Sequence, residues 1–390
     1  MLLSVVGSPN TGKSTFFSAI TLSDVEISPR PFTTIKPNFG VTYVRFPCPC
    51  KELGLKCNPK NSICKDGIRF VPINIIDVAG LVPGAHLGKG LGNKFLDDIR
   101  ATDILIQVVD VSGKIDAEGN PTEFYDPANE VIFLDDEISQ WISGILKKAQ
   151  SKIKGKGIEG IEEVFTGLKI KKDQIIKAAK KVNLDIENVG KIEWKDEDRL
   201  EFSKEIRKIA MPIIIAANKI DLPGARENYE KLKKKFPEKV IIPTYSDGEL
   251  ALRRANEKKI INYTPGDFGF EIINASERQK EALEKIKRVM KENEDFGTGV
   301  QKVLEEAVRK LKLIVVYPVS DENKFTDHFG KVLPDAILVK EGTTAIQLAE
   351  KIHTDLAKNF IFAIDAKKKL RIGRDHILKN GDIIKIVSGK

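Results

Sequence analysis

The chain opens with an apolar stretch at 2–6 that runs directly into the octet GSPNTGKS at 7–14. The octet matches the pattern G-x-x-x-x-G-K-[S/T]. Its glycines allow the backbone to wrap a phosphate with N–H groups, at the positively polarised start of a helix. Such a loop requires a buried strand before it and a helix after it. This feature therefore predicts an α/β domain with a phosphate-binding loop at the end of its first strand.

Further apolar runs predict the rest of a sheet. They are continuous rather than alternating, helical patterns separate them, and they lie at 68–76, 104–111, 213–217 and 240–242. Strands buried on both faces have this composition, so we expect a mostly parallel sheet covered by helices. No apolar run approaches the roughly 18 residues of a membrane-spanning helix.

The motif DVAG at 77–80 stands at the end of the second predicted strand. A carboxylate at Asp77 can hold Mg²⁺ through water there, and the Gly80 N–H can meet a γ-phosphate. Lys13 of the octet would reach the β- and γ-phosphates, and the Ser14 hydroxyl would ligate the same ion. D-x-x-G is a common tetrapeptide, so its position after a strand carries the assignment.

The motif NKID at 218–221 follows the fourth predicted strand. The Asp221 carboxylate can accept two N–H bonds from the edge of guanine, whereas adenine lacks that pair of donors. Lys219 would lie along the plane of the base. Phosphate loop, magnesium motif and base-reading motif occur in the order that predicts a P-loop GTPase.

Changes of pattern predict four segments: the first part of a G domain (1–113), a helical insertion (114–209), the second part of the G domain with helices (210–312), and a C-terminal unit (313–390). In the insertion, apolar residues recur at helical spacing between Ile138 and Ile153. In the C-terminal unit, the pattern of apolar residues predicts four short strands and one helix, which Thr343 or Thr344 would cap.

The sequence around the motifs resembles that of the Obg/YchF family of GTPases, in the archaeal form of its YchF branch. The resemblance covers essentially the whole chain. It rests on a switch-like loop PFTTIKPN at 31–38, a Gly-rich string at 80–96, and stretches at 338–345, 352–355 and 381–384 that resemble a TGS domain. It implies a Ras-like G domain of the P-loop NTPase fold, a coiled-coil-like helical insertion, and a C-terminal TGS domain of the β-grasp fold.

Carried over residue by residue, the resemblance implies a complete nucleotide site. Thr34 would bind Mg²⁺ together with Ser14 and Asp77, with the adjacent Thr33 as the alternative. Lys13, Thr34 and Gly80 would be the catalytic groups. The nucleotide would be held by Gly7, Asn10, Thr11, Gly12, Lys13, Ser14, Thr15, Asn218, Lys219, Asp221, Tyr245 and Ser246.

Three side chains bear on the rate of hydrolysis. Leu81 takes the position where many GTPases place a water-orienting glutamine, and an aliphatic side chain cannot orient water, so intrinsic turnover should be slow. Asn10 matches an asparagine that helps related GTPases to bind an activating K⁺; the alternative is a residue that only braces the loop. His86 is either a solvated loop residue or a group near the γ-phosphate.

Of the two loops expected to contact the base, one keeps the usual GTPase sequence and the other departs from it. Many members of the branch have an altered base motif and prefer ATP, whereas the intact motif at 218–221 predicts GTP here. The loop at 243–249 departs from the usual Thr-Ser-Ala-Glu sequence. In spite of this difference, we expect a backbone N–H near Tyr245 and Ser246 to meet the guanine oxygen.

All four cysteines of the chain fall within 17 residues, with the spacing C-x-C-x₆-C-x₆-C: Cys48, Cys50, Cys57 and Cys64. Four thiols can make a tetrahedral Zn²⁺ site, although zinc sites usually use pairs two to four residues apart. One or two disulfides, or reduced thiols that only pack, are the alternatives. So few cysteines in 390 residues exclude a disulfide scaffold. The low number of cysteines and the absence of a basic segment before the apolar stretch at 2–6 together predict a cytoplasmic protein.

The net charge of +8 is unevenly distributed. Residues 147–191 hold 12 Lys against 6 acidic residues, and residues 312–390 hold 14 Lys and Arg against 10. These segments are either solvated lysine-rich surfaces or a face for nucleic acid. By resemblance, the partner is the ribosome or its RNA, with a protein partner as the alternative and a monomer as the expected state.

The sequence thus predicts a Mg²⁺-dependent protein that binds GTP and GDP, hydrolyses GTP slowly and acts as a molecular switch on the ribosome. Two alternatives stay open. One is a nucleotide-regulated protein-binding module without an RNA target, and the other is an ATPase like other members of the branch.

Overall fold

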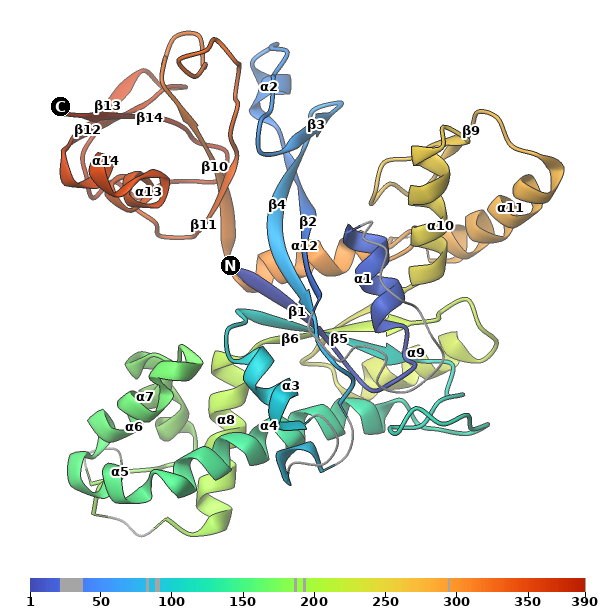
Figure 1. The fold of residues 1–390 in the computed structure, drawn as a ribbon, viewed down its shortest axis with the longest axis vertical. Helices are drawn as coiled ribbons and strands as arrows, with labels where there is room; N and C mark the ends of the chain where they lie inside the picture. The colour runs from blue at the N-terminus through green and yellow to red at the C-terminus, as the bar shows by residue number, and fades with distance from the viewer. Residues whose placement is uncertain are drawn as a thin grey trace. The chain divides into compact units, whose positions relative to one another are not determined.

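The computed structural model describes residues 1–21, 38–81, 84–87, 92–185, 188–191, 194–293 and 295–389. The chain forms two compact units, each built from two stretches of sequence. The first unit comprises Met1–Gly40 and Asn74–Val303, and the second comprises Val41–Ile73 and Leu304–Lys390. Figure 1 shows the course of the chain through both.

The main sheet has the strand order β2-β4-β1-β5-β6-β7. Its core is parallel: β1 (Leu2–Val6) lies between β4 (Ile68–Asp77) and β5 (Ile104–Asp110), and β6 (Ile213–Asn218) and β7 (Val240–Thr244) follow. Every residue of β5 and β6 is buried. The predicted parallel sheet is confirmed. Because parallel strands end at one edge, the segments after β1, β4, β5 and β6 meet there.

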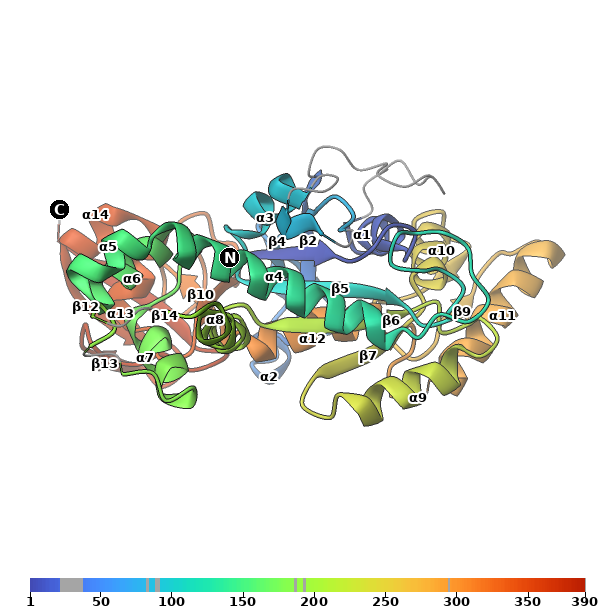
Figure 2. The same ribbon diagram turned by 90° about the horizontal axis from the view of Figure 1, so that it is seen from below.

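Helices α4 (Ala128–Lys148) and α9 (Ala225–Lys235) cover one face of β5–β7, as Figure 2 shows. One apolar cluster contains Ala128 and Val131 of α4 together with Ala225 and Tyr229 of α9. Helix α1 (Lys13–Thr21), which starts inside the phosphate-loop motif, packs against α10 (Ser246–Glu257).

The predicted insertion is helical. It consists of the later turns of α4 followed by α5 (Gln150–Lys156), α6 (Ile158–Phe165), α7 (Lys172–Lys181) and α8 (Asp196–Ala210), which Figure 1 draws in green. Ile138 and Ile142 of α4 share an apolar cluster with Phe165 and Phe202. The Trp194 ring stands edge-on to Phe202, with the ring centroids 5.4 Å apart. Helix α4 thus belongs to both the sheet and the insertion.

The remaining elements of the first unit are short, apart from one helix. They are η1 (Ala85–Leu87), α3 (Gly92–Ile99), η2 (Thr166–Leu168), β8 (Ile261–Asn262), β9 (Glu271–Ile272) and α11 (Glu277–Glu292). Ser276 caps α11, because its hydroxyl accepts from the Gln279 N–H while the Gln279 side chain accepts from the Ser276 N–H.

The C-terminal part of the second unit is a mixed sheet with a helix on one face. The order β11-β10-β14-β12-β13 is formed by β10 (Leu313–Val319), β11 (Ile337–Lys340), β12 (Phe360–Asp365), β13 (Leu370–Ile372) and β14 (Ile383–Ser388). Ala345 and Leu348 of α13 (Ala345–Ile352) pack on Val316 and Ile384. Thr344 caps α13, as predicted. The predicted β-grasp unit is confirmed.

The second unit also contains a hairpin whose first three elements the sequence did not predict: β2 (Asn38–Pro47, in this unit from Val41 onward), α2 (Pro49–Glu52) and β3 (Ile63–Lys65). The first half of β4, a predicted strand, completes the hairpin, which carries all four cysteines. Helices α12 (Val300–Lys310) and α14 (Thr354–Lys358) complete the elements. None of the helices in the described ranges combines the length and the hydrophobicity that a membrane span requires.

Candidate nucleotide-binding site

The phosphate loop follows β1 and has a backbone that only glycine permits at two points. Gly7 has φ +143°, and a Cβ there would lie 2.4 Å from the Val108 carbonyl oxygen. Gly12 has φ +97°, and a Cβ there would lie 2.3 Å from Nδ2 of Asn218. The loop is therefore fixed by contact with β5 on one side and with the base-reading motif on the other.

Lys13 folds back over this loop. Its Nζ donates a 2.6 Å hydrogen bond to the Ser8 carbonyl, as does the Thr11 hydroxyl at 3.0 Å. Burial lowers the pKa of Lys13 to about 8, against the opposing effect of Asp77 and Glu130. Lys13 thus keeps a buried amino group against the phosphate loop, where its positive charge suits a phosphate.

Ser14 and Asp77 meet as the sequence predicts. The Ser14 hydroxyl donates to Oδ2 of Asp77 at 3.4 Å. Asp77 is fully buried, and burial raises the pKa of its carboxyl to about 6 while Lys13 acts in the opposite direction. Its Oδ1 has no hydrogen-bond partner among the residues described. A hydroxyl beside a buried carboxylate with an open oxygen fits a Mg²⁺ ion. Thr33 and Thr34 lie outside the described residues.

Asn218 joins three loops that are far apart in the sequence. Its Nδ2 donates to the Thr11 carbonyl at 3.0 Å, and its Oδ1 accepts from the Ser246 hydroxyl at 2.7 Å. The neighbouring Lys219 donates from Nζ to the Asn10 carbonyl at 2.9 Å and to Oδ2 of Asp110 at 2.7 Å. The phosphate loop, the base-reading motif and the start of α10 are thereby brought together.

Tyr245, one of the residues predicted to contact the base, lies directly before α10. Its backbone N–H donates to the Thr298 carbonyl at 2.8 Å. Its ring covers Gly248, where a Cβ would lie 2.4 Å from the ring. The unusual sequence of this loop therefore places a tyrosine ring over a glycine. Asp221 is exposed, and with the nearby Asp247 it acts to raise the pKa of the Tyr245 hydroxyl, which burial already raises.

Asn10 braces the phosphate loop from the side. It has φ +63°, and its Nδ2 donates to the Gly119 carbonyl at 2.9 Å. The loop that contains Gly119 follows β5, so this contact joins the ends of β1 and β5. Thr15 is buried in the first turn of α1.

Glu130 is a site residue that sequence reasoning missed. It lies in the first turn of α4, is 2% exposed, and accepts a hydrogen bond from the Ser8 hydroxyl of the phosphate loop. Burial raises the pKa of its carboxyl to about 7, while Ser8 and Lys13 act to lower it. No signal in the sequence links Glu130 to a loop 122 positions away.

Glu137 is a second missed residue, two turns further along α4. Its carboxylate accepts from the Gly84 N–H at 2.6 Å and from the His86 N–H at 2.8 Å, and it contacts Nδ1 of His86 at 2.6 Å. The loop after Gly80 is therefore tied to the helix that continues into the insertion. His86 is held by this contact rather than left in solvent.

Gly80 and Leu81 sit directly against the phosphate loop. A Cβ at Gly80 would lie 3.1 Å from the Pro9 ring, and the Leu81 N–H donates to the Gly7 carbonyl at 3.1 Å. The Leu81 side chain is 1% exposed and packs with Val6 and Phe95 in the apolar core. It is therefore held away from any water at a γ-phosphate.

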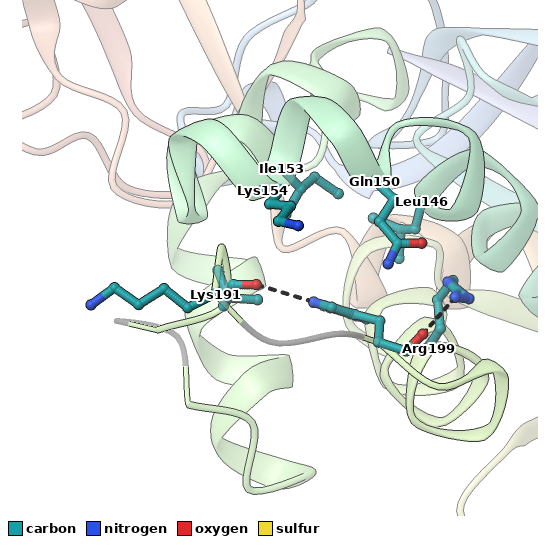
Figure 3. Close-up of a pocket in the computed structure, with 8 residues that line it drawn as sticks. Leu146, Gln150, Ile153, Lys154, Lys191 and Arg199 are labelled. Atoms are coloured by element: carbon teal, nitrogen blue, oxygen red, sulfur yellow. Dashed lines mark hydrogen bonds between the residues drawn. The ribbon is translucent and has the colours of Figure 1, made fainter.

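The insertion contains a hollow of its own, of about 290 Å³. Figure 3 shows Leu146, Ile153 and Lys154 on one side and Lys191 and Arg199 on the other. The Arg199 guanidinium donates to the Trp194 carbonyl at 2.8 Å. None of the residues predicted for the nucleotide site lines this hollow.

Comparisons with known families cover most of the chain. Residues 3–134 match the model of the 50S ribosome-binding GTPase family. Residues 216–321 match the G4 motif-containing domain of Obg-like GTPases of the YGR210-like type, and residues 330–388 match the TGS domain.

Individual proteins match along their whole length. The chain is 51% identical to the uncharacterized GTP-binding protein MJ1332 of Methanocaldococcus jannaschii, with 99% of both chains covered. It is 29% identical to the ribosome-binding ATPase YchF of Mycoplasma genitalium, over 97% of this chain and 96% of the relative. A crystal structure of a GTP-binding protein from Pyrococcus horikoshii aligns over 100% of both chains, with 38% identity and a TM-score of 0.78. The chain therefore belongs to the Obg/YchF family of P-loop GTPases and carries a C-terminal TGS domain.

Proposed function

We propose that this protein is a Mg²⁺-dependent guanine-nucleotide switch that hydrolyses GTP slowly and acts on the ribosome. The observation that carries the proposal is the position of Asn218, which joins the phosphate loop to the Ser246 loop through hydrogen bonds of 3.0 and 2.7 Å. One residue thereby fixes the distance between the phosphate and base ends of the site.

Guanine specificity would rest on Asp221. Its exposed carboxylate can accept two N–H groups from guanine, while adenine presents a different pattern of donors. Relatives whose names call them ATPases are the reason to keep ATP as the alternative. Competition between unlabelled ATP and a fluorescent GTP analogue decides the point. GTP should displace the analogue at concentrations at least 100-fold lower than ATP.

In the reaction, Lys13 and the phosphate-loop N–H groups would hold the β- and γ-phosphates. Ser14 and Asp77 would hold Mg²⁺, which would supply positive charge to offset that of the phosphates. The Gly80 N–H would contact the γ-phosphate. Leu81 is packed in the core, so no side chain at that position orients water. We therefore expect slow intrinsic hydrolysis.

Asn10 gives the same proposal a further test. Its Nδ2 already donates to Gly119, so the carbonyl oxygen of the amide is the atom left to approach a cation. If this oxygen helps to bind K⁺, GTP turnover should be faster in KCl than in NaCl of equal ionic strength. Equal rates in the two salts would assign Asn10 the bracing role alone.

The switch would act through the loop after Gly80. A γ-phosphate that contacts Gly80 changes the position of this loop, and Glu137 holds the same loop to α4 with three contacts. Since α4 also forms the core of the insertion, nucleotide state would alter the insertion as well.

The insertion is the part we assign to the partner. Between Lys147 and Lys191 it has 12 lysines against 6 acidic residues, and several of these lysines, including Lys148, Lys154 and Lys180, are exposed. Others are paired with acidic residues, as Lys152 and Lys156 are with Glu163, so the positive field is only partly neutralised. An exposed lysine surface suits RNA phosphates. The match to ribosome-binding GTPases and the name of the Mycoplasma relative support a ribosomal target.

Sedimentation with purified ribosomes tests this target directly. The protein, which we take to be a cytoplasmic monomer, is mixed with ribosomes in the presence of a non-hydrolysable GTP analogue or of GDP. Co-sedimentation should require the analogue and fall steeply between about 50 and 200 mM salt, as expected when several lysines contact phosphates. Absence of co-sedimentation at low salt in either state would favour a nucleotide-regulated module that binds a protein partner.

A further inference from the structure

The four cysteines of the chain converge on one point in the second unit. Their Sγ atoms all lie within 4.8 Å of one another. Cys48 and Cys57 are 4.0 Å apart, and Cys50 and Cys64 are 3.8 Å apart. None of the four takes part in a disulfide. The nucleotide site uses no cysteine, so this cluster needs a separate explanation.

The local backbone is folded to direct the thiols inward. The Cys48 N–H donates to the Gly67 carbonyl at 2.8 Å, which joins the start of α2 to the turn between β3 and β4. The Leu55 N–H donates to the Cys50 carbonyl at 2.8 Å and closes the turn after α2. Cys64 lies on β3 opposite Arg69 of β4. Three separate pieces of backbone thus present their sulfur atoms to one centre.

We propose that the four thiolates bind a single structural Zn²⁺ ion. With Zn–S bonds of about 2.3 Å, the edges of a regular tetrahedron are about 3.8 Å, close to the two pair distances of 4.0 and 3.8 Å. A disulfide needs about 2.05 Å between two sulfurs and does not need the other pair nearby. Convergence of all four on one point is the arrangement of a Cys₄ metal site.

Arg69 fits the charge that remains once a divalent ion binds four thiolates. Its side chain is fully buried and donates to the Ser62 hydroxyl at 3.0 Å and to the Leu333 carbonyl at 2.7 Å. Its Nε has no hydrogen-bond acceptor in the described part of the chain. Arg69 also lies opposite Cys64 in the pairing of β3 with β4. A buried guanidinium beside the sulfurs would offset part of the net charge of −2.

The role of the ion follows from what the cysteine loop contacts. Between Cys57 and Cys64, the Asn58 N–H donates to the Val332 carbonyl at 2.8 Å, and the Lys60 N–H donates to the Pro334 carbonyl at 2.7 Å. Asn61 exchanges two 3.0 Å hydrogen bonds with the backbone of Ala336. The loop held by the metal therefore pairs with the segment that leads into β11. Zinc would fasten this loop to the β-grasp part of the second unit.

Metal content of the full-length protein, purified without chelator or metal-binding tag, is the first test. We expect about one zinc per chain and four thiols that react with a thiol reagent only after denaturation. The variant C57S should lose the zinc, whereas K56S, an exposed neighbour, should keep it. Refolding with Co²⁺ should give the visible spectrum of a tetrahedral tetrathiolate.

A second measurement keeps the test independent of variants that fail to fold. Removing metal from the wild-type chain with a chelator under reducing conditions should raise amide exchange at 58–61 and 332–336, and should leave the phosphate loop unchanged. The proposal is overturned by wild-type protein that holds no metal, by iron in place of zinc, or by a mass that shows two hydrogens lost per disulfide.

Discussion

Replacing Glu130 by glutamine tests the charge arrangement beneath the phosphate loop. Burial raises the pKa of this carboxyl from 4.5 to about 7, so the folded protein binds a proton there that the unfolded chain releases. Between about pH 4.5 and pH 7, raising the pH therefore lowers the free energy of unfolding. Each unit of pKa shift corresponds to about 1.4 kcal/mol, so the full cost is about 3 kcal/mol and is complete above pH 7.

Glutamine keeps the shape of the side chain and removes its ionisation. The variant E130Q should match the wild type near pH 4.5 and should be more stable by up to about 3 kcal/mol at pH 8. Urea unfolding of nucleotide-free protein at several pH values, followed by tryptophan fluorescence, measures this difference. Both tryptophans, Trp141 and Trp194, lie in the first unit. The variant E159Q, at an exposed position, is the matched control and should follow the wild type.

The reasoning fails if E130Q is less stable than the wild type by the same amount at every pH. That result would mean that Glu130 stays ionised throughout, held by the Ser8 hydroxyl and by Lys13. The alternative assigns Glu130 a permanent negative charge close to the phosphates.

Three further outcomes are expected. Changing Glu137 to alanine removes the acceptor that holds Gly84 and His86, so the difference in amide exchange of the insertion between GTP-analogue and GDP states should shrink several-fold; an undiminished difference would place the coupling elsewhere. Changing Asp221 to alanine should weaken GTP analogues at least 100-fold in a fluorescence titration, since two hydrogen bonds to a charged acceptor are lost, with little change for ATP. Changing Ile142, which is fully buried, to alanine should cost about 2–5 kcal/mol in urea unfolding, with nucleotide affinity retained.

The sequence predicted the elements whose pattern is local. Continuous apolar runs predicted β1 and the other core strands, and the helical spacing of apolar residues between Ile138 and Ile153 predicted the helices found there. The phosphate-loop motif and the base-reading motif were recognisable because each is a contiguous string that follows a strand.

The parts that could not be predicted depend on contacts between distant residues. Glu130 reaches Ser8 across 122 positions, and Glu137 reaches Gly84 across 53. Both glutamates precede the helical pattern predicted from Ile138 onward, and neither belongs to a recognisable motif. In the hairpin that carries the cysteines, β2 and β3 were missed for a different reason. Strand β2 buries Thr42 and leaves Phe39 and Val41 exposed, so its burial does not follow its apolar residues, and the cysteine loop interrupts the usual strand-and-turn pattern.

Helix α4 has a mechanical consequence. Its 21 residues make a rod about 31 Å long, at 1.5 Å per residue. Glu130 touches the phosphate loop near one end, Glu137 holds the loop after Gly80 two turns on, and Ile142 is rooted in the insertion. A tilt of only 5° about the first end would move the far end by about 3 Å. The helix would thus convert a small tilt at the phosphate loop into a larger displacement inside the insertion.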